Sequence, residues 1–358
     1  MAENSGANLT EVAYISRQVI KYGAVLLVTL MVGRFSITAF ATYWKATHPP
    51  APPPPTVGFG LLPTIPFPQQ QDELKPKSYQ LETATGGFPD MGDRAKVYLM
   101  LKSVPSLLDD EKAKKTAANF GFVFAPDPLD SDNYRFSKSQ PLESTFEVNI
   151  RNSAFSLSTD FLSHPELLQN SEVPDQTAGI NIVKTTLSSA ELLPPDVATA
   201  SGETVYLKAL GNELSPALSF SDADYLEVNL QRTPLDGKFL SYTPEGKQGI
   251  IHAILSGAFS GKNSIVKMDY HYQTVDYTHV ETYPIRTAKM AWQLLQSGSG
   301  YIADKGEYDT AVVRTVSLGY YESFQEQDYL QPVYVFEGDG GFMAFVGAID
   351  SKNVQSSN

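Results

Sequence analysis

Two short motifs in this sequence have the residue types of an acyl-transfer site. Ser264–Lys267 fits the pattern S-x-x-K, and Ser131–Asn133 fits S-D-N. In penicillin-recognising enzymes the S-x-x-K serine opens a helix and precedes S-D-N, and a K-T-G motif follows. Here the order is reversed, the S-x-x-K run has the apolar pattern of a strand, and K-T-G is missing. The pair therefore predicts no acyl-enzyme chemistry.

The glycine-rich segment 257–263 fits two other motifs only in part. Its serine, Ser260, stands one place later than the nucleophile of a G-x-S-x-G elbow. Gly261-Lys262-Asn263 lacks the hydroxyl residue and the spacing of a phosphate-binding loop. We expect this segment to form a turn.

Residues that ligate metals are few. His271 and His279 share a face only if one strand runs unbroken between them, and neither has a clear carboxylate partner. Asp127, Asp130 and Asp132 crowd one loop, without the glycine and terminal glutamate of a calcium loop. The chain has no cysteine, which excludes a thiolate nucleophile and disulfides. The sequence predicts no catalytic residue, no metal and no cofactor.

The apolar run Gly23–Trp44 determines on which side of a membrane the rest of the chain lies. The segment Leu9–Lys21 can extend this run as helix. A bilayer core of about 30 Å needs about 20 apolar residues in a helix. Tyr22, Tyr43 and Trp44 stand at the two ends of the run, where amphipathic rings prefer the headgroup layer. We expect a single transmembrane helix over residues 23–44.

Arg34 is the one charge inside this run. A central arginine costs about 2.5–3.5 kcal/mol on insertion scales. Local bilayer thinning can absorb that cost, or Arg34 can contact a carboxylate or polar group of a partner helix. A third reading is a signal peptide with Ala24–Gly33 as its apolar region and cleavage after Ala39-Phe40-Ala41. Arg34 is the candidate for an intramembrane partner contact.

Charge predicts the orientation and limits the partners. Arg17 and Lys21 precede the apolar run and Lys45 alone follows it, which favours a cytoplasmic N-terminus (residues 1–22). We therefore expect a single-pass protein of the cell membrane with an extracytoplasmic C-terminal domain. Residues 1–56 carry a net charge of +2, so the total of −13 leaves −15 for the remainder. Such an acidic domain repels phosphate backbones, and we expect no nucleic-acid partner.

A proline-rich stretch follows the apolar run. Nine of the 24 prolines fall between Pro49 and Pro68. The polyproline II helix rises about 3.1 Å per residue, so the run 49–55 predicts a semi-rigid spacer of roughly 20 Å within residues 45–78. A ligand for a proline-recognition domain is the alternative. We expect residues 57–78 to be an extended lead-in, the folded part to start near Tyr79, and residues 351–358 to be a tail.

The pattern of the folded part predicts a helix followed by antiparallel strands, three times, and hence an α+β fold with helices on one face of antiparallel sheet. The expected helices are 106–120, capped by Ser106 with Asp109 and carrying an apolar stripe that starts at Leu107 and Leu108; 175–193, capped by Asp175 and stopped by Pro194-Pro195; and 287–296. The expected strands are 79–83, 95–101, 146–150, 155–159, 204–210, 225–232, 239–243, 249–256, 265–277, 312–322, 329–337 and 342–350.

Three further details of this domain can be predicted. Two strings recur, Val97–Leu99 as Val205–Leu207 and Glu147–Ile150 nearly as Glu227–Leu230, but at different offsets, so a duplicated αβ unit stays open. Pro332 lacks an N–H, which predicts an edge strand. Trp292 shares the apolar face of its helix, and we expect it to be structural and buried against the strands around Leu318, Val333, Val335 and Phe345.

Residues 286–350 are similar to a known module. The helix string from Ala291-Trp292 to Gly298-Ser299-Gly300, then Leu318-Gly319-Tyr320-Tyr321, then Leu330-Gln331-Pro332-Val333, resembles the C-terminal unit of YycI/YycH-type regulators, which is related to PepSY-like modules. The likeness covers about 65 of 358 residues. It implies a non-catalytic module that contacts other envelope proteins, including a sensor kinase. Residues 79–285 form the rest of the extracytoplasmic region.

Together these features predict a non-enzymatic, regulatory or structural envelope protein. Its single span anchors it in the membrane, and its outer domain is expected to bind another protein or a cell-envelope component. The alternative is an envelope hydrolase whose site is assembled from scattered residues.

Overall fold

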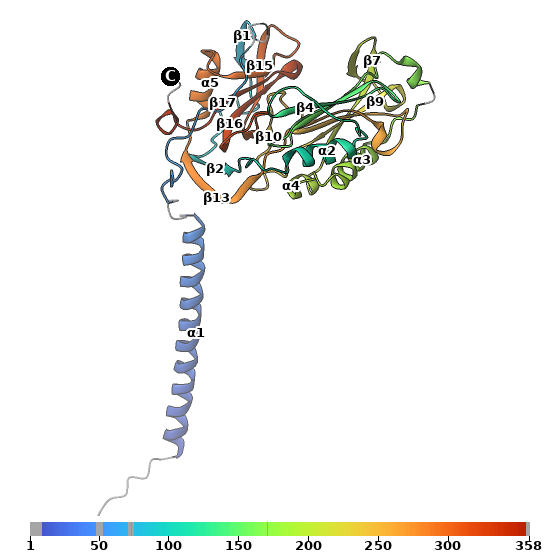
Figure 1. The fold of residues 1–358 in the computed structure, drawn as a ribbon. Coiled ribbons are helices and arrows are strands. Elements are labelled where there is room, and N and C mark those ends of the chain that lie inside the picture. The colour runs from blue at the N-terminus through green and yellow to red at the C-terminus, as the bar shows by residue number, and fades with distance from the viewer. Residues whose placement is uncertain (1–8, 48–52, 71–72, 74, 170, 356–358) are drawn as a thin grey trace, which may run out of the picture. The chain divides into compact units, whose positions relative to one another are not determined.

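The structure, a computed structural model, describes residues 9–47, 53–70, 73, 75–169 and 171–355 (Figure 1). The chain divides into two compact units, residues 1–54 and residues 55–358. Part of the predicted proline spacer, residues 48–52, lies outside the described residues.

The first unit contains one long helix, α1, which spans Leu9–Thr47. By length and composition, its part from Leu9 to Lys45 is able to cross a membrane. The hydroxyls of Thr29, Thr38 and Thr42 each donate to the carbonyl four residues earlier, at 2.8–3.0 Å. These three hydroxyls therefore have hydrogen-bond partners within the helix and need none from water. Arg34 lies exposed on the helix. Its contact with a partner helix stays a prediction.

The second unit contains a nine-stranded antiparallel sheet in the order β3-β4-β5-β6-β12-β11-β9-β7-β8. The hairpins β4–β5 and β5–β6 form one half, the strands β7, β8, β9, β11 and β12 form the other, and β6 joins β12 between them. The bounds are β3 Asp127–Pro128, β4 Asn133–Lys138, β5 Ser144–Asn149, β6 Phe155–Thr159, β7 Glu203–Leu210, β8 Glu213–Pro216, β9 Tyr225–Leu230, β11 Ile251–Ser256 and β12 Ile265–Tyr270.

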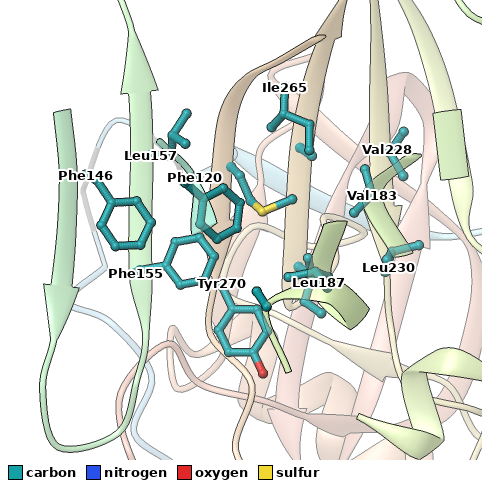
Figure 2. Packing of buried hydrophobic residues seen from close by; sticks show 14 of the residues in the cluster. Phe120, Phe146, Phe155, Leu157, Val183, Leu187, Val228, Leu230, Ile265 and Tyr270 are labelled. Carbon is teal, nitrogen blue, oxygen red and sulfur yellow. The ribbon is translucent and has the colours of Figure 1, made fainter. Parts of the chain in front are cut away.

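Three helices cover one face of this sheet: α2 (Asp109–Asn119), α3 (Gln176–Ser189) and the short α4 (Pro195–Ala198). Alternate residues of each strand point to the helices, because side chains of a strand alternate between its faces. The resulting core holds a row of aromatic rings and aliphatic side chains from α3 and β9 (Figure 2). Successive ring centroids along the row Phe120, Phe146, Phe155 and Tyr270 lie 4.9–5.4 Å apart.

The predicted helix caps are confirmed only in part. Asp175 caps α3, since its side chain accepts from the Ala178 N–H at 2.8 Å. The Ser106 N–H donates to the Asp109 carboxylate at 2.7 Å, but Ser106 does not cap α2, because the residue before the helix is Leu108, which makes no side-chain cap bond. Gly121 follows α2 with a φ of +85°, a left-handed conformation that glycine adopts without strain.

Two helix boundaries differ from the prediction. α2 begins at Asp109, so Leu107 and Leu108 precede it and lie exposed instead of joining its apolar stripe. α3 ends at Ser189, and Pro195 opens α4, because proline is well accommodated in the first turn of a helix.

The second sheet has eight strands, with the order β1-β15-β16-β17-β14 along its main path. In addition, β2 pairs with β16, β13 pairs with β2, and β10 pairs with β15. Only β1 and β10 pair in parallel, both with β15. Helix α5 (Ala288–Gln296) packs against β17. The bounds are β1 Ser78–Leu81, β2 Arg94–Met100, β10 Ser241–Tyr242, β13 Val275–Pro284, β14 Tyr301–Asp304, β15 Thr310–Tyr321, β16 Tyr329–Gly338 and β17 Met343–Gly347.

The two recurring strings occupy unlike places in the fold. Glu147–Ile150 begins in β5 and Glu227–Leu230 lies in β9, in the same sheet, and each of these strands contacts a helix, α2 and α3 respectively. Val97–Leu99 lies in β2 of the eight-stranded sheet, whereas Val205–Leu207 lies in β7 of the nine-stranded one. The likeness of Val97–Leu99 to Val205–Leu207 therefore reflects strand composition. A duplicated αβ unit rests on the likeness of Glu147–Ile150 to Glu227–Leu230 alone.

Pro332 does not mark an edge strand, and that prediction is wrong. β16 lies inside its sheet, with β15 on one side and β2 and β17 on the other. Pro332 stands between the residues that pair with β2, ending at Leu330, and those that pair with β17, starting at Val333. Its carbonyl accepts from the Ala348 N–H at 3.0 Å. The missing N–H falls where the neighbouring strand changes, so the ladder tolerates it.

Trp292 is buried on the inner face of α5, as predicted, with 7% of its surface exposed. Its ring lies 5.7 Å from Phe336 and also packs against Tyr79 and Phe88. The expected neighbours were partly wrong. Val333, Val335 and Phe345 belong to a cluster separate from that of Trp292, since residues at odd and even positions of a strand face opposite sides.

We expect Trp292→Ala to lower the free energy of unfolding by about 3–5 kcal/mol, because the truncation leaves a cavity in a closed core. Thermal melting of the protein measures this as a drop of several degrees. Met290→Ala, on the exposed side of α5, is the control and should change melting little. Unchanged melting together with loss of partner capture would instead make Trp292 a binding residue.

The folded unit begins well before Tyr79, contrary to the prediction. The segment Pro55–Gln70, here called the strap, lies along the eight-stranded sheet from β13 to β14. The Val57 N–H donates to the Thr282 carbonyl of β13 at 3.0 Å. At the other end, the Gln70 side chain accepts from the Ile302 N–H of β14 at 2.7 Å.

The middle of the strap is part of the core. Leu62 is fully buried and its backbone pairs with the C-terminal segment, through bonds to Asn353 and Gln355 of 2.9 and 2.8 Å. Phe67 packs against Tyr301 and Tyr321 with centroids 5.4 and 4.6 Å away. Residues 351–355 are therefore not a tail, and residues 55–70 are not a free lead-in.

Candidate functional site

The S-x-x-K and S-D-N motifs have structural roles. Ser264 ends a short 3-10 helix, and its hydroxyl donates to the Gly261 carbonyl at 2.6 Å. Asn133 of the S-D-N string opens β4, which β5 and β6 separate from Lys267 on β12. The sheet therefore does not bring the two motifs together.

The aspartate loop is built by turn hydrogen bonds. Asp130 accepts from the backbone N–H groups of Asp132 and Asn133 at 2.7 and 2.8 Å, and these bonds together with that from the Asn133 side chain lower its pKa. Asp132 forms an ion pair with Arg151 at 2.7 Å. Among the residues described, no group of three or more His, Asp or Glu side chains has the arrangement of a metal site.

The predicted strand 265–277 is two strands, and this separates the two histidines. β12 ends at Tyr270 in the nine-stranded sheet, and β13 starts at Val275 in the other sheet. His279 is exposed and lies 2.6 Å from Asp276, whereas His271 falls in the connection between the sheets. A shared ligand face is therefore excluded.

The connection that holds His271 lines a cavity between the two sheets of the second unit, here called the inter-sheet cleft. Its volume is about 540 Å³, within the range of ligand sites. Loops from both sheets contribute to it, namely residues 101–103, 152–154, 191–195, 270–274 and 323–326. The cleft thus depends on how the two sheets meet.

The cleft offers an aromatic surface and a neutral imidazole. The His271 ring stacks on Phe324 with centroids 4.3 Å apart, and burial lowers the pKa of His271. Within the described residues its Nδ1 atom is buried without a hydrogen-bond partner.

The charged side chains around the cleft are engaged with other groups. Lys102 pairs with Asp328 at 2.5 Å and Glu191 pairs with Lys115 at 2.8 Å. The Glu326 carboxylate accepts from the backbone N–H of Ser103 at 2.8 Å. The chemistry that this lining supports is binding of a neutral or polar group, and it shows no paired acid and base aimed at one point.

A buried ion cluster joins the two sheets beside the cleft. Arg232, just after β9, donates through two nitrogens to Glu322, just after β15, at 2.8 and 2.6 Å. It also contacts Asp196 of α4 at 2.5 Å and the carbonyl of the cleft residue Gln273 at 3.0 Å. Burial opposes the arginine charge, but the Glu322 carboxylate raises its pKa well above the ordinary value. The arginine therefore remains charged.

Sequence reasoning missed this cluster. Its three charged members come from a strand end, another strand end and a four-residue helix, 36 and 90 residues from Arg232. No local spacing links them. The only sequence signal is weak: Arg232 and Glu322 are the last residues of the predicted strands 225–232 and 312–322.

A second polar cluster crosses the nine-stranded sheet. His252 lies on the face opposite the helix-covered core, since its neighbours Ile251 and Ala253 point into that core. Its Nδ1 is 3.4 Å from Asp269 and its Nε2 is 3.3 Å from Glu227. Burial opposes protonation of His252, but the two carboxylates raise its pKa above the ordinary value.

This cluster predicts a pH dependence. A raised pKa in the folded state contributes stability below the unfolded pKa of about 6.5, and that contribution is lost as pH rises through the folded value. We expect the melting temperature of the wild type to fall, relative to His252→Gln, as the pH rises from about 6.5. The lowered pKa of His271 changes stability with pH in the opposite direction. Because the wild type and His252→Gln both contain His271, its contribution cancels in the comparison. Parallel pH profiles would contradict the assignment.

Neither a scan against protein-family models nor a search of the curated proteins finds a match to this chain.

Proposed function

We propose that this is a single-pass protein of the cell membrane whose outer domain binds another envelope protein or a cell-envelope component in the inter-sheet cleft, without catalysis. The observation that carries the proposal is the cleft itself. It has the volume of a ligand site, and the stacked rings of His271 and Phe324 line it. Its charged groups, in contrast, are engaged with residues outside the lining or with backbone.

Two further features support the proposal. α1 is long and apolar enough to be the anchor, and Arg17 and Lys21 on its N-terminal side favour a cytoplasmic N-terminus. The resemblance of residues 286–350 to YycI/YycH-type modules favours a protein as the ligand. The exposed apolar residues Leu101 and Val104, at and just beyond the cleft lining, suit a protein surface as well.

Site-specific photocrosslinking in living cells tests the binding site. A photoreactive amino acid at Gln325, which lines the cleft, should give a discrete adduct, and the same change at Gln293 on the exposed side of α5 should not. His271→Ala should weaken the Gln325 adduct. Equal adducts at both positions would place binding elsewhere. Turnover of an envelope polymer that His271→Ala abolishes would favour the hydrolase alternative.

Topology is tested separately. Protease added to intact cells or spheroplasts should digest residues 55–355 and leave a protected fragment of about twenty N-terminal residues plus the span. Protection of the large unit in sealed cells would reverse the proposed orientation.

A further inference from the structure

A second cavity, independent of the cleft, lies under the strap. It has a volume of about 300 Å³, at the lower end of the range for ligand sites. Ile65 and Phe67 of the strap, Ile349 after β17, and Val354 of the C-terminal segment give it largely apolar walls. Arg286, which precedes α5, also lines it. We call this cavity the Arg286 pocket.

Arg286 carries a charge that the described residues leave mostly unsatisfied. A guanidinium has five N–H donors. One nitrogen of the Arg286 guanidinium donates to the Ile349 carbonyl at 2.7 Å, and within the described part of the chain this side chain makes no ion pair. Burial lowers the pKa of Arg286, and Asp350 opposes that effect only in part. The Asp350 carboxylate accepts instead from the Lys352 N–H at 3.1 Å.

A half-buried cation without an ion partner is unusual, because burying a charge is unfavourable unless a counter-charge or hydrogen bonds compensate. One feature adds to the positive potential at this point. Helix α5 begins at Ala288, two residues after Arg286, and the N-terminus of a helix carries a partial positive charge.

The geometry and the lining together define the ligand chemistry. A planar guanidinium matches a carboxylate, which it binds through two parallel hydrogen bonds. The apolar walls suit a hydrocarbon chain. At roughly 30 Å³ per water-sized group, the pocket holds about ten non-hydrogen atoms. We propose that the Arg286 pocket binds a small aliphatic carboxylate, with the carboxylate on Arg286 and the chain against Ile65 and Val354.

Octanoate, which has the required size and charge, is the probe. Calorimetric titration of the full chain in lipid nanodiscs, with empty nanodiscs as the blank, should show saturable binding. Arg286→Gln should weaken it at least tenfold, and Arg286→Lys should keep part of it. Octanol, with the same chain and no charge, should bind at least tenfold more weakly than octanoate.

Two neighbouring variants separate blocked binding from damaged folding. Ser351 lines the pocket and is exposed, so Ser351→Trp should fill the pocket and abolish binding without lowering the melting temperature. Lys352→Trp, at the next and equally exposed position, should bind as the wild type does. The proposal is overturned if octanoate does not bind, if Arg286→Gln leaves its affinity unchanged, or if octanol binds as well. A peptide with a free C-terminal leucine is a second probe. If it binds more tightly than octanoate, and if amidation of its C-terminus abolishes the binding, the ligand is the C-terminus of a peptide chain and not a small acid.

Discussion

A chain of residues 55–358 is expected to unfold cooperatively, and a chain that starts at Tyr79 is expected to be severely destabilised or to aggregate. The strap supplies Leu62, which is fully buried, and Ile65 and Phe67, which pack on an aromatic cluster. Full burial of one such side chain contributes about 1.5–3 kcal/mol. Loss of all three removes roughly 5 kcal/mol, which is comparable with the whole stability of a marginal domain, about 5–15 kcal/mol.

Thermal and urea unfolding of the two truncated proteins measures this difference. Leu62→Ala in the longer protein is the graded control, with an expected loss of about 2–5 kcal/mol for a fully buried leucine. Leu61→Ala, at the exposed neighbouring position, should have little effect. If the protein that starts at Tyr79 melts at the same temperature as the longer one, the strap is not part of the core. The shorter protein also lacks one wall of the Arg286 pocket, and it should not bind octanoate.

The elements that the sequence predicts well are those with local signals. Asp175 and Gly121 mark helix ends through bonds and backbone angles that involve only their near neighbours. The burial of Trp292 follows from the spacing of apolar residues on one helix face. The long apolar run predicts α1 from composition alone. In each case the physical cause lies within a few residues of the signal.

The errors concern contacts between distant segments. The strap is predicted as an extended lead-in, but a turn at Val57–Gly60 interrupts it, where the Gly60 N–H donates to the Val57 carbonyl at 3.1 Å. The partners that hold the strap, Thr282 and Asn353, lie more than 200 residues away. Pro332 breaks the edge-strand rule because a neighbouring strand changes at its position, which only the tertiary pairing reveals. The cleft is likewise made by five loops from different parts of the chain. The local sequence pattern contains no information about contacts between segments that are far apart in the chain.

Arg232→Met is expected to lower the free energy of unfolding by about 3–5 kcal/mol, because it leaves a buried carboxylate without its partner. Glu322 is 2% exposed, so it cannot turn to water. The double variant Arg232→Met, Glu322→Leu should be less destabilised than the sum of its single variants, since it removes both buried charges. Asp196, with 13% of its side chain exposed, retains some access to solvent and the Tyr277 hydroxyl as a donor at 2.8 Å. Urea unfolding of the four proteins gives the coupling free energy.

An exposed ion cluster around Arg314 is the control for the buried cluster around Arg232. Arg314 forms ion pairs with Asp339 and Glu82, and all three side chains are well exposed, so Arg314→Met should change stability little. Because Arg232 also holds the Gln273 carbonyl of the cleft, Arg232→Met should weaken the Gln325 photocrosslink at temperatures where the protein is still folded. Glu322 and Asp196 reach Arg232 from the second sheet and from α4, so the cluster fixes the distance between the two walls of the cleft. If Arg232→Met is no more harmful than Arg314→Met, apolar packing alone holds the sheets together, and the cleft keeps its shape without the buried charges.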